Sequence, residues 1–528
     1  MTPQTPGAQP ARTRRAWLDP SFPVHPLLAA AYPVVFLFAA NAADQVTLDP
    51  LWMPLLVAVG VGAVAFGALW ALLRDPWRAG LVVTVLATLF LWYGHAWNLT
   101  SALLGSQVPL IMAWSLAAVA GVILALRAGE WRRSASLFLN LVTAGLIAFN
   151  AAEIAAYSLG SAAAVTAPSG TPTIDDPAPA RRPDIYYLIF DRYGSGRNLS
   201  ANYGFDNSPF LDALRERGFY VADGANANYI KTPLSLVSSL NMEYLDEEVL
   251  QAEAVSGKDS GVIHRQLRGP LRVPTDLKAL GYRHVHVANW WEPSAASATA
   301  DVVHRYEAAS EFSSAVLRMS ALGAIGAGSS LGPYDRAVLY QHTLFEFRVL
   351  ESSADDPGPK FVFAHFLVPH PPYVFAADGS FVRDEPIATE DERAAYLRQM
   401  EYTNGRILGL VDRLLDRPRE ERPIILLQAD EGPFPSRYDA DEWRFDWRSA
   451  TDAELAEKFG ILSAYHLPGV DAEDAGLYPE ITPVNSFRVV FNAYFGADLP
   501  LLRDRVFAHI SQQRFYDFFE VTDRLDER

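Results

Sequence analysis

The sequence predicts an N-terminal bundle of about five transmembrane helices, followed by an α/β domain with a mostly parallel central sheet. Three observations predict it. Long uncharged apolar segments crowd the first 160 residues, an Ala/Pro/Ser/Thr-rich stretch follows, and strand-like and helix-like segments alternate after residue 183. We therefore divide the chain into a transmembrane domain (1–160), a linker (161–183) and an extracytoplasmic domain (184–528).

Five apolar segments are each about long enough to cross a bilayer, which takes roughly 20 residues. A buried helical core is the alternative, but five such runs in succession are hard to bury in a soluble domain. The first follows a polar start and lacks a small-residue cleavage site, which indicates an anchor and not a removed signal peptide. The segments lie near 26–43, 51–73, 79–97, 108–126 and 136–158.

Basic residues flank these segments on one side only. Arginines lie before the first segment, between the second and third, and between the fourth and fifth, whereas the alternate loops hold Asp44 and Asp49 or no charge. Positive residues stay in the cytoplasm. The pattern therefore predicts a multi-pass cell-membrane protein with a cytoplasmic N-terminus and everything after the fifth segment outside.

The charge of the exterior domain restricts what it can bind, and its lack of cysteine restricts how it can be stabilised. Residues 161–528 hold 36 Lys and Arg against 55 Asp and Glu, a net charge of −19. Such a surface repels nucleic acid, so no nucleic-acid partner is expected. The chain has no cysteine, so the exterior domain depends on an ordinary core, for which about 350 residues is ample.

The exterior domain alternates short apolar runs with helix-like segments, which favours a layered α/β fold. In such folds ligands bind beyond the carboxyl ends of the strands. Strands are expected at Ile185–Phe190, Phe219–Ala222, Arg283–Ala288, Lys360–Leu367, Pro423–Gln428 and Gly460–His466. Helices are expected at Pro209–Arg217, Thr232–Leu240, Thr275–Leu280, Asp391–Leu415 and Ser486–Tyr494.

Carboxylates follow two of these strands. Asp191 comes directly after the first, and Asp430 and Glu431 come after the Pro423–Gln428 run. A carboxylate at the mouth of an apolar strand needs a partner, and two adjacent carboxylates before a glycine turn suit a hard cation. The alternatives are a pair with Arg192 or a helix cap for Asp191, and a solvated acidic turn for the other two.

Thr232 is a candidate nucleophile. It lies in Lys231-Thr232-Pro233, a typical helix start. The positive field of a helix N-terminus would favour its alkoxide and an incoming phosphate or sulfate. An ordinary threonine N-cap is the alternative.

The most unusual string, residues 363–373, places His370 between prolines in a rigid loop after a strand. An imidazole held there suits anion contact or proton transfer, with loop packing as the alternative. His365 is expected to be a packed strand residue, and packing is also favoured for His466. Trp290, in Asn-Trp-Trp at another strand end, can wall a pocket, although aromatic packing is the commoner explanation.

The order of these motifs resembles the sulfatase branch of the alkaline phosphatase superfamily. The motifs are Pro-Asp-Ile running to Asp191, Thr-Pro-x-Ser at 232–235, His-Pro-Pro-Tyr at 370–373 and Leu-Gln-Ala-Asp-Glu-Gly at 427–432. With its N-terminal spans, the chain looks most like the lipoteichoic acid synthase and phosphoethanolamine transferase group. The resemblance covers roughly residues 183–496 and the membrane layout.

The resemblance implies an alkaline-phosphatase-like fold with one divalent metal ion. Thr232 would be the nucleophile that forms a covalent phospho-enzyme, and His370 would contact substrate. Lys231 and Trp290 are further candidate substrate contacts. The implied metal ligands are Asp191, Thr232, Asp430 and Glu431.

The sequence departs from the family at three places. The family's Asp-His-Gly is here Asp-Glu-Gly at 430–432, which adds charge and hardness and favours Mn²⁺ or Mg²⁺, with Ca²⁺ or Zn²⁺ as alternatives. Arg192 stands where many two-metal members have a second acid, which suits a single-metal site. Lys231 and Ser235 stand where true sulfatases have the Cys and Arg of their formylglycine element.

The expected function is that of a membrane-anchored, metal-dependent hydrolase or transferase. Its substrates would be phospho(di)esters of envelope lipids or glycans, so a membrane lipid or lipid-linked molecule is the expected partner. The changed ligand Glu431 supports an alternative, a catalytically weak or inactive envelope binding or scaffold protein. A sulfuric-ester hydrolase is the other alternative.

Overall fold

The computed structural model describes residues 19–42, 47–162, 182–254, 256–257, 259–307, 310–325, 336–383 and 392–526. The chain forms two compact units. One contains the N-terminal helices and a segment that begins at Phe312, and the other contains the sheet and the rest of the chain. Most of the predicted linker lies outside the described residues.

The first unit confirms the predicted membrane helices. Four helices are long and apolar enough to cross a membrane, and a shorter apolar helix, α1 (His25–Ala40), lies where the first span is predicted. Side chains such as Leu56 and Leu72 are 67% and 75% exposed, as expected of lipid-facing positions. The four long helices are α2 (Asp49–Leu73), α3 (Pro76–Leu104), α4 (Gln107–Leu126) and α5 (Arg132–Ala162).

A short helix from the middle of the chain belongs to this helical unit. Helix α12 (Glu311–Met319) packs Phe312 edge-to-face on Phe38 of α1, with ring centroids 5.2 Å apart. At α3, a Cβ on Gly94 would lie 2.5 Å from the Cα of Met319, so only glycine permits this close approach. The polypeptide therefore returns to the membrane helices after it has begun the sheet.

The second unit confirms the predicted mostly parallel sheet. Its seven strands are ordered β2-β7-β6-β1-β5-β3-β4. Strands β6, β1, β5, β3 and β4 are parallel, and β7 runs antiparallel to β6. The strands are β1 (Ile185–Phe190), β2 (Tyr220–Val221), β3 (Arg283–Val287), β4 (Val302–His304), β5 (Lys360–Phe366), β6 (Ile424–Gln428) and β7 (Ser463–His466).

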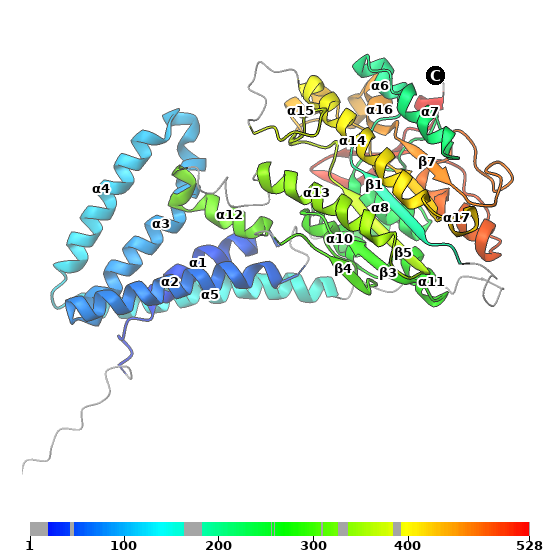
Figure 1. Ribbon diagram of the computed structural model, residues 1–528. Coiled ribbons are helices and arrows are strands. Elements are labelled where there is room, and N and C mark those ends of the chain that lie inside the picture. The colour runs from blue at the N-terminus through cyan, green and yellow to red at the C-terminus, as the bar shows by residue number, and fades with distance from the viewer. Residues whose placement is uncertain are drawn as a thin grey trace, which may run out of the picture. The chain divides into compact units, whose positions relative to one another are not determined.

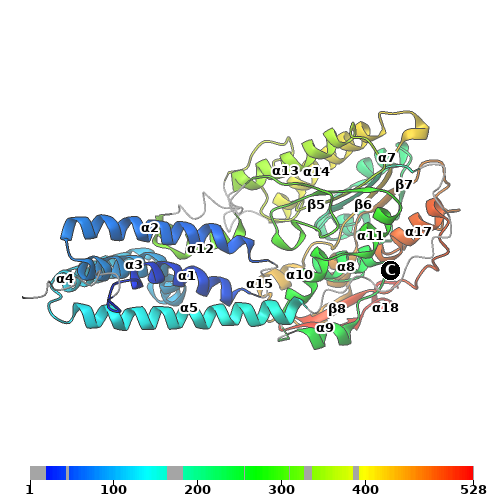
Figure 2. The same ribbon diagram turned by 90° about the horizontal axis from the view of Figure 1, so that it is seen from below.

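Helices cover both faces of this sheet. Figure 2 shows α13 and α14 on one face and α8, α11 and α17 on the other. Strands β1, β5 and β6 are buried along their whole length and are mostly apolar, although β5 also contains Lys360 and His365. The main helices are α7 (Ser208–Glu216), α8 (Thr232–Asn241), α10 (Gly261–Arg268), α11 (Arg272–Ala279), α13 (Arg336–Ser353), α14 (Glu392–Leu415) and α17 (Pro483–Phe495).

Shorter elements complete the unit, and some of them were not predicted. A two-stranded antiparallel sheet of β8 and β9 follows the helix that was expected to be the last element. Figure 1 shows this C-terminal part in red. These elements are α6 (Gly196–Tyr203), α9 (Glu247–Glu253), α15 (Ser436–Ala440), α16 (Asp452–Phe459), β8 (Phe507–Ser511), β9 (Arg514–Glu520) and α18 (Asp523–Asp526).

Candidate active site

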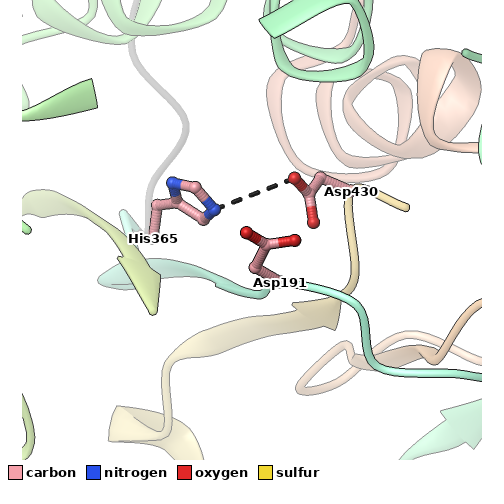
Figure 3. A group of neighbouring side chains, drawn as sticks. All are labelled: Asp191, His365 and Asp430. Atoms are coloured by element: carbon pink, nitrogen blue, oxygen red, sulfur yellow. Dashed lines mark ion pairs between the residues drawn. The ribbon is translucent and has the colours of Figure 1, made fainter. Parts of the chain in front are cut away.

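The carboxyl ends of three neighbouring parallel strands bring together two acids and one histidine. Asp191 follows β1, Asp430 follows β6 and His365 is the penultimate residue of β5. The backbone N–H of Asp191 donates to the carbonyl of Phe366, which ties the end of β1 to β5. Each of the three offers a ligand atom within 4.8 Å of the other two, and Figure 3 shows the side chains converging on one space.

The two carboxylates in this group lack the partners that buried acids usually have. Asp191 and Asp430 are 3% and 2% exposed. Asp191 Oδ1 and both carboxylate oxygens of Asp430 are buried without a hydrogen-bond partner. Burial and the neighbouring Asp430 raise the pKa of Asp191 well above its usual value. Burial and Glu431 raise the pKa of Asp430 to about 7, so the pair is costly to keep ionised without a cation.

Thr232 lies at the start of α8 and does not cap it. The N-cap residue is Lys231, and the helix begins with Thr232 and Pro233. The Thr232 hydroxyl lies close enough to Asp430 to oppose the rise in the pKa of that carboxyl, although no hydrogen bond of ordinary geometry satisfies Asp430. The threonine is therefore available for chemistry beside the two acids.

Glu431 is engaged by cations and lies outside the group of three. Its Oε1 is 3.0 Å from Nζ of Lys458 and 3.7 Å from Nε of Arg192. The Lys458 side chain is fully buried, its ammonium also donates to the carbonyl of Gly432, and burial lowers its pKa to about 7. The charge of Glu431 is thus already balanced by protein groups.

Three cations surround one aromatic ring next to Glu431. The Lys458 ammonium lies 3.2 Å, the Arg192 guanidinium 4.3 Å and the Lys231 ammonium 4.5 Å from the ring centroid of Phe434. Lys231 also donates to Tyr438 at 2.7 Å and pairs with Glu442 at 3.3 Å. Cation–π contacts hold these charges in place, and the result is a positive wall beside Thr232.

His370 lies near Asp191. Its Nε2 is 4.0 Å from Asp191 Oδ2, and its Nδ1 lies against the carbonyl of Pro371. Burial lowers the pKa of His370 well below its usual value, so the ring is neutral near pH 7. Gln399 donates to the carbonyl of His370 at 2.9 Å and helps to fix the loop.

Both tryptophans at the end of β3 pack against the core, which is the alternative that the sequence also allowed. Trp290 is half-buried and packs against the hydrophobic core. Its neighbour Trp291 is the ring that lies edge-to-face with His365, with centroids 6.2 Å apart. Trp291 therefore packs against a residue of the group, while the assignment of Trp290 to substrate contact stays a prediction.

Sequence reasoning missed two residues of this region. His365 was interpreted as a packed strand residue, and it is buried, but its Nε2 faces the carboxylates. Lys458 carried no local signal, because it lies in an ordinary helical segment, α16. The one available hint was the place of His365 at the carboxyl end of an apolar strand, where ligands bind.

These residues fit the divalent metal ion that the resemblance implies. Asp191, Asp430, the Thr232 hydroxyl and an imidazole nitrogen are all groups that bind divalent metals. The carboxylate oxygens without hydrogen-bond partners lie close together, and a cation bound among them would offset their charge.

Comparison with known proteins gives structural neighbours only. The chain matches no protein-family model and no curated protein. The C-terminal periplasmic domain of EcEptC from Escherichia coli is 13% identical, with a TM-score of 0.43, over 68% of this chain and 97% of that one. That domain has also been solved in complex with Zn.

Two further neighbours are a transferase and a sulfatase. The integral membrane lipooligosaccharide phosphoethanolamine transferase A from Neisseria meningitidis is 12% identical, with a TM-score of 0.40, over 89% of this chain and 95% of that one. BT1596, a 2-O GAG sulfatase, is 12% identical, with a TM-score of 0.39, over 63% of this chain and 78% of that one. These are the groups that the motifs resemble. At such low identities, the reaction has to be inferred from this chain's own residues.

Proposed function

We propose that this protein is a membrane-anchored transferase or hydrolase that cleaves phosphate esters of envelope lipids or lipid-linked glycans, with Thr232 as the nucleophile. The observation that carries the proposal is the placement of Thr232. Its hydroxyl lies at the N-terminus of α8 beside Asp430, and it does not serve as the helix cap. A hydroxyl in that position is suited to covalent catalysis.

The bonding changes of the first step follow from these residues. The Thr232 oxygen forms a bond to phosphorus while the bond from phosphorus to the leaving oxygen breaks. The Thr232 proton passes to the neutral His370 imidazole, and His370 returns it to the leaving oxygen. Lys231, Arg192 and the N-terminus of α8 provide positive charge for the phosphoryl oxygens.

In the second step Thr232 becomes the leaving group. A hydroxyl of an acceptor, or water, attacks phosphorus and gives its proton to His370, and the bond between phosphorus and Thr232 breaks as that proton reaches the threonine oxygen. A divalent metal held by Asp191, Asp430 and Thr232 would lower the pKa of the Thr232 hydroxyl and offset phosphoryl charge. Trp290 is proposed to wall the substrate pocket.

The membrane arrangement supports a lipid or lipid-linked substrate. Arginines flank the predicted spans on one side, so we propose a cytoplasmic N-terminus and an exterior sheet unit, with residues 161–183 as the linker. A catalytic domain on this side would meet head groups of the outer membrane surface. The acidic character of residues 161–528 disfavours a strongly polyanionic acceptor.

Trapping the phospho-enzyme tests the proposal. Full-length protein in detergent would be incubated with phosphatidylethanolamine or phosphatidylglycerol labelled in the head group, and digested for mass spectrometry. With diacylglycerol as the leaving group, we expect the peptide that contains Thr232 to gain the mass of the labelled phosphoethanolamine or phosphoglycerol group. Thr232→Ala should lose head-group release by about a thousand-fold or more, whereas Thr232→Ser retains part of it.

Ser239→Ala is the matched control, because Ser239 lies on the same helix and its hydroxyl bonds within the helix to the carbonyl of Ser235. It should leave turnover within about threefold. Release that persists in Thr232→Ala would eliminate Thr232 as the nucleophile. A wild-type protein that binds these lipids without releasing head groups would favour the scaffold alternative, which the engagement of Glu431 by Lys458 supports.

A further inference from the structure

The imidazole of His365 points at two acids and makes no bond with either. Its Nε2 is buried without a partner and lies 3.8 Å from Oδ2 of Asp430. Figure 3 shows this nitrogen directed at the space that the carboxylates of Asp191 and Asp430 share. Other buried histidines, such as His342, also leave one ring nitrogen without a partner. What distinguishes His365 is that its free nitrogen faces two buried carboxylates.

The other side of the ring is held by two polar side chains. The amide of Asn289 is oriented because its Oδ1 accepts from the backbone N–H of Trp291, and its Nδ2 donates to the carbonyl of His365 and to Ser294 Oγ. His365 Nδ1 lies 3.0 Å from both Asn289 Nδ2 and Ser294 Oγ. The two amide hydrogens have closer acceptors at 2.8 Å, the His365 carbonyl and Ser294 Oγ, so Ser294 Oγ is the better partner for Nδ1.

The Ser294 hydroxyl is compatible with the tautomer of His365 that a metal ligand needs. When Ser294 Oγ donates to Asn289 Oδ1 at 3.1 Å, it can accept the hydrogen of His365 Nδ1, and Nε2 then keeps a free lone pair. Metal-binding histidines are held in this way, with the second nitrogen donating to a polar partner that orients the ring.

The distance at Nε2 distinguishes a cation from a proton. Nitrogen and oxygen that share a hydrogen bond lie about 2.7–3.2 Å apart, whereas ligand atoms that share one Zn²⁺ lie about 3–4 Å apart, because each is about 2.1 Å from the ion. The observed 3.8 Å falls in the second range. A lone pair and two carboxylates repel one another unless a positive charge lies among them.

Glu431, in contrast, has its charge balanced already. Lys458 lies 3.0 Å from Glu431 Oε1 and Arg192 lies 3.7 Å from it. Its other oxygen, Oε2, is buried without a hydrogen-bond partner. Glu431 nevertheless lies outside the group of residues whose ligand atoms come within 4.8 Å of one another, which consists of Asp191, His365 and Asp430.

We propose that His365, and not Glu431, supplies the fourth protein ligand of the metal site, together with Asp191, Asp430 and Thr232. The imidazole that the Asp-His-Gly motif would provide from position 431 is provided instead by β5, and the Glu431–Lys458 pair braces the turn after β6. The catalytic use of this site rests on the proposed function, but metal binding by these residues does not require Thr232 to be a nucleophile.

The ligand set also indicates the class of metal. One imidazole and two carboxylates favour a borderline divalent ion such as Zn²⁺, Mn²⁺ or Fe²⁺. Ca²⁺ and Mg²⁺ prefer sites made of oxygen alone. The hardness that Glu431 would add to the site, which favoured Mg²⁺ at the level of sequence, is absent when Glu431 does not bind the ion.

Metal binding by five forms of the full-length protein in detergent tests the proposal. After removal of metal with a chelator, Zn²⁺ affinity would be measured by titration calorimetry, and the ligands of bound Zn²⁺ by X-ray absorption. The wild type should bind one Zn²⁺ with one imidazole. His365→Gln should lose the imidazole signal and at least about tenfold in Zn²⁺ affinity. Ser294→Ala removes a partner that orients the His365 ring, and it should lower the Zn²⁺ affinity by about tenfold.

The double variant Glu431→Gln/Lys458→Met removes the neighbouring ion pair without leaving a lone charge. It should keep the imidazole signal and an affinity within about threefold of wild type. His342→Gln is the matched control, since His342 is also buried but bonds to the backbone carbonyl of Ala288, and it should bind Zn²⁺ as the wild type does.

Three results would overturn the proposal. They are an imidazole signal that survives in His365→Gln, loss of that signal in the Glu431/Lys458 double variant, or no binding of Zn²⁺ or Mn²⁺ by the wild type. The proposed function fails separately, because full turnover by Thr232→Ala with normal Zn²⁺ binding would remove the nucleophile and leave the metal site intact.

Discussion

The two ends of strand β1 carry buried acids in opposite situations. Asp184 lies just before the strand, and its Oδ2 is 2.5 Å from the ammonium of Lys360, whose backbone N–H also donates to it. Asp191 lies just after the strand, and its Oδ1 has no hydrogen-bond partner. Both are less than 10% exposed, so burial alone does not separate them.

The difference shows how a single strand can serve the fold at one end and a ligand at the other. A buried acid with a lysine partner ties β1 to β5. A buried acid without such a partner destabilises the folded chain, and so it indicates a group that arrives from outside. The adjacent pair Asp430 and Glu431 repeats the contrast, because Lys458 neutralises only Glu431.

Breaking the ion pair between Asp184 and Lys360, at the amino end of β1, should have the largest effect on stability. Lys360→Met leaves the buried carboxyl group of Asp184 without its lysine partner, and we expect the free energy of unfolding to fall by about 3–5 kcal/mol. Denaturant unfolding of the detergent-solubilised chain, followed by tryptophan fluorescence, measures this. The double variant Asp184→Asn/Lys360→Met should recover most of the loss, and a double variant as unstable as the single one would contradict the explanation.

The acids at the carboxyl end should make the metal-free protein less stable as pH rises. The pKa of Asp430 in the folded chain is about 7, against roughly 3.9 when unfolded. Its contribution is complete below pH 4 and is lost as pH rises through 7, on the order of 3–4 kcal/mol. Unfolding of chelator-treated wild type and Asp430→Asn at pH 5 and 7.5 measures the difference, and equal pH slopes would contradict it.

Removing one acid at the carboxyl end should stabilise the metal-free protein. Asp191→Asn relieves the repulsion between Asp191 and Asp430, and we expect a gain of about 1–3 kcal/mol in the free energy of unfolding at pH 7.5. The same variant should lose Zn²⁺ binding and turnover. Loss of stability in chelator would show that Asp191 has a structural partner like that of Asp184.

The smallest effect on the free energy of unfolding should come from Arg417, a partly exposed neighbour of Asp184 at the amino end of β1. Arg417 lies 3.5 Å from Asp184 Oδ2 and its side chain is 19% exposed. Since Lys360 already balances the acid, Arg417→Gln should cost only about 1 kcal/mol or less. A cost equal to that of Lys360→Met, in the same unfolding measurement, would show that the pair is a three-membered network.

Much of this architecture was accessible from the sequence because local patterns determine it. The six apolar residues of β1 match the predicted strand to the residue, and the end of β6 places Asp430 where a ligand is expected. The apolar N-terminal segments formed helices for the same reason, since a long uncharged run can satisfy its backbone only as a helix in lipid. Thr232 was predicted beside a helix start and lies at one.

Other features depended on which strands became neighbours. His365 looked like a packed residue because nothing in 360–367 says that β5 lies beside β1 and faces Asp430. The partner of Glu431 comes from α16, 27 positions further along the chain. The short helix α12 is far in sequence from the membrane helices on which it packs.

By itself, the sequence determined the membrane helices, the central parallel strands and the acids at the strand ends, because hydrophobic patterning and chain direction act over a few residues. Only the tertiary structure decided which acids are neutralised by lysines and which face an imidazole, because electrostatic pairing in a buried site depends on distances of 3–4 Å between segments far apart in the chain. Thus Asp184 and Asp191, which flank the same strand in the sequence, differ in the folded protein in whether a lysine pairs with the carboxylate.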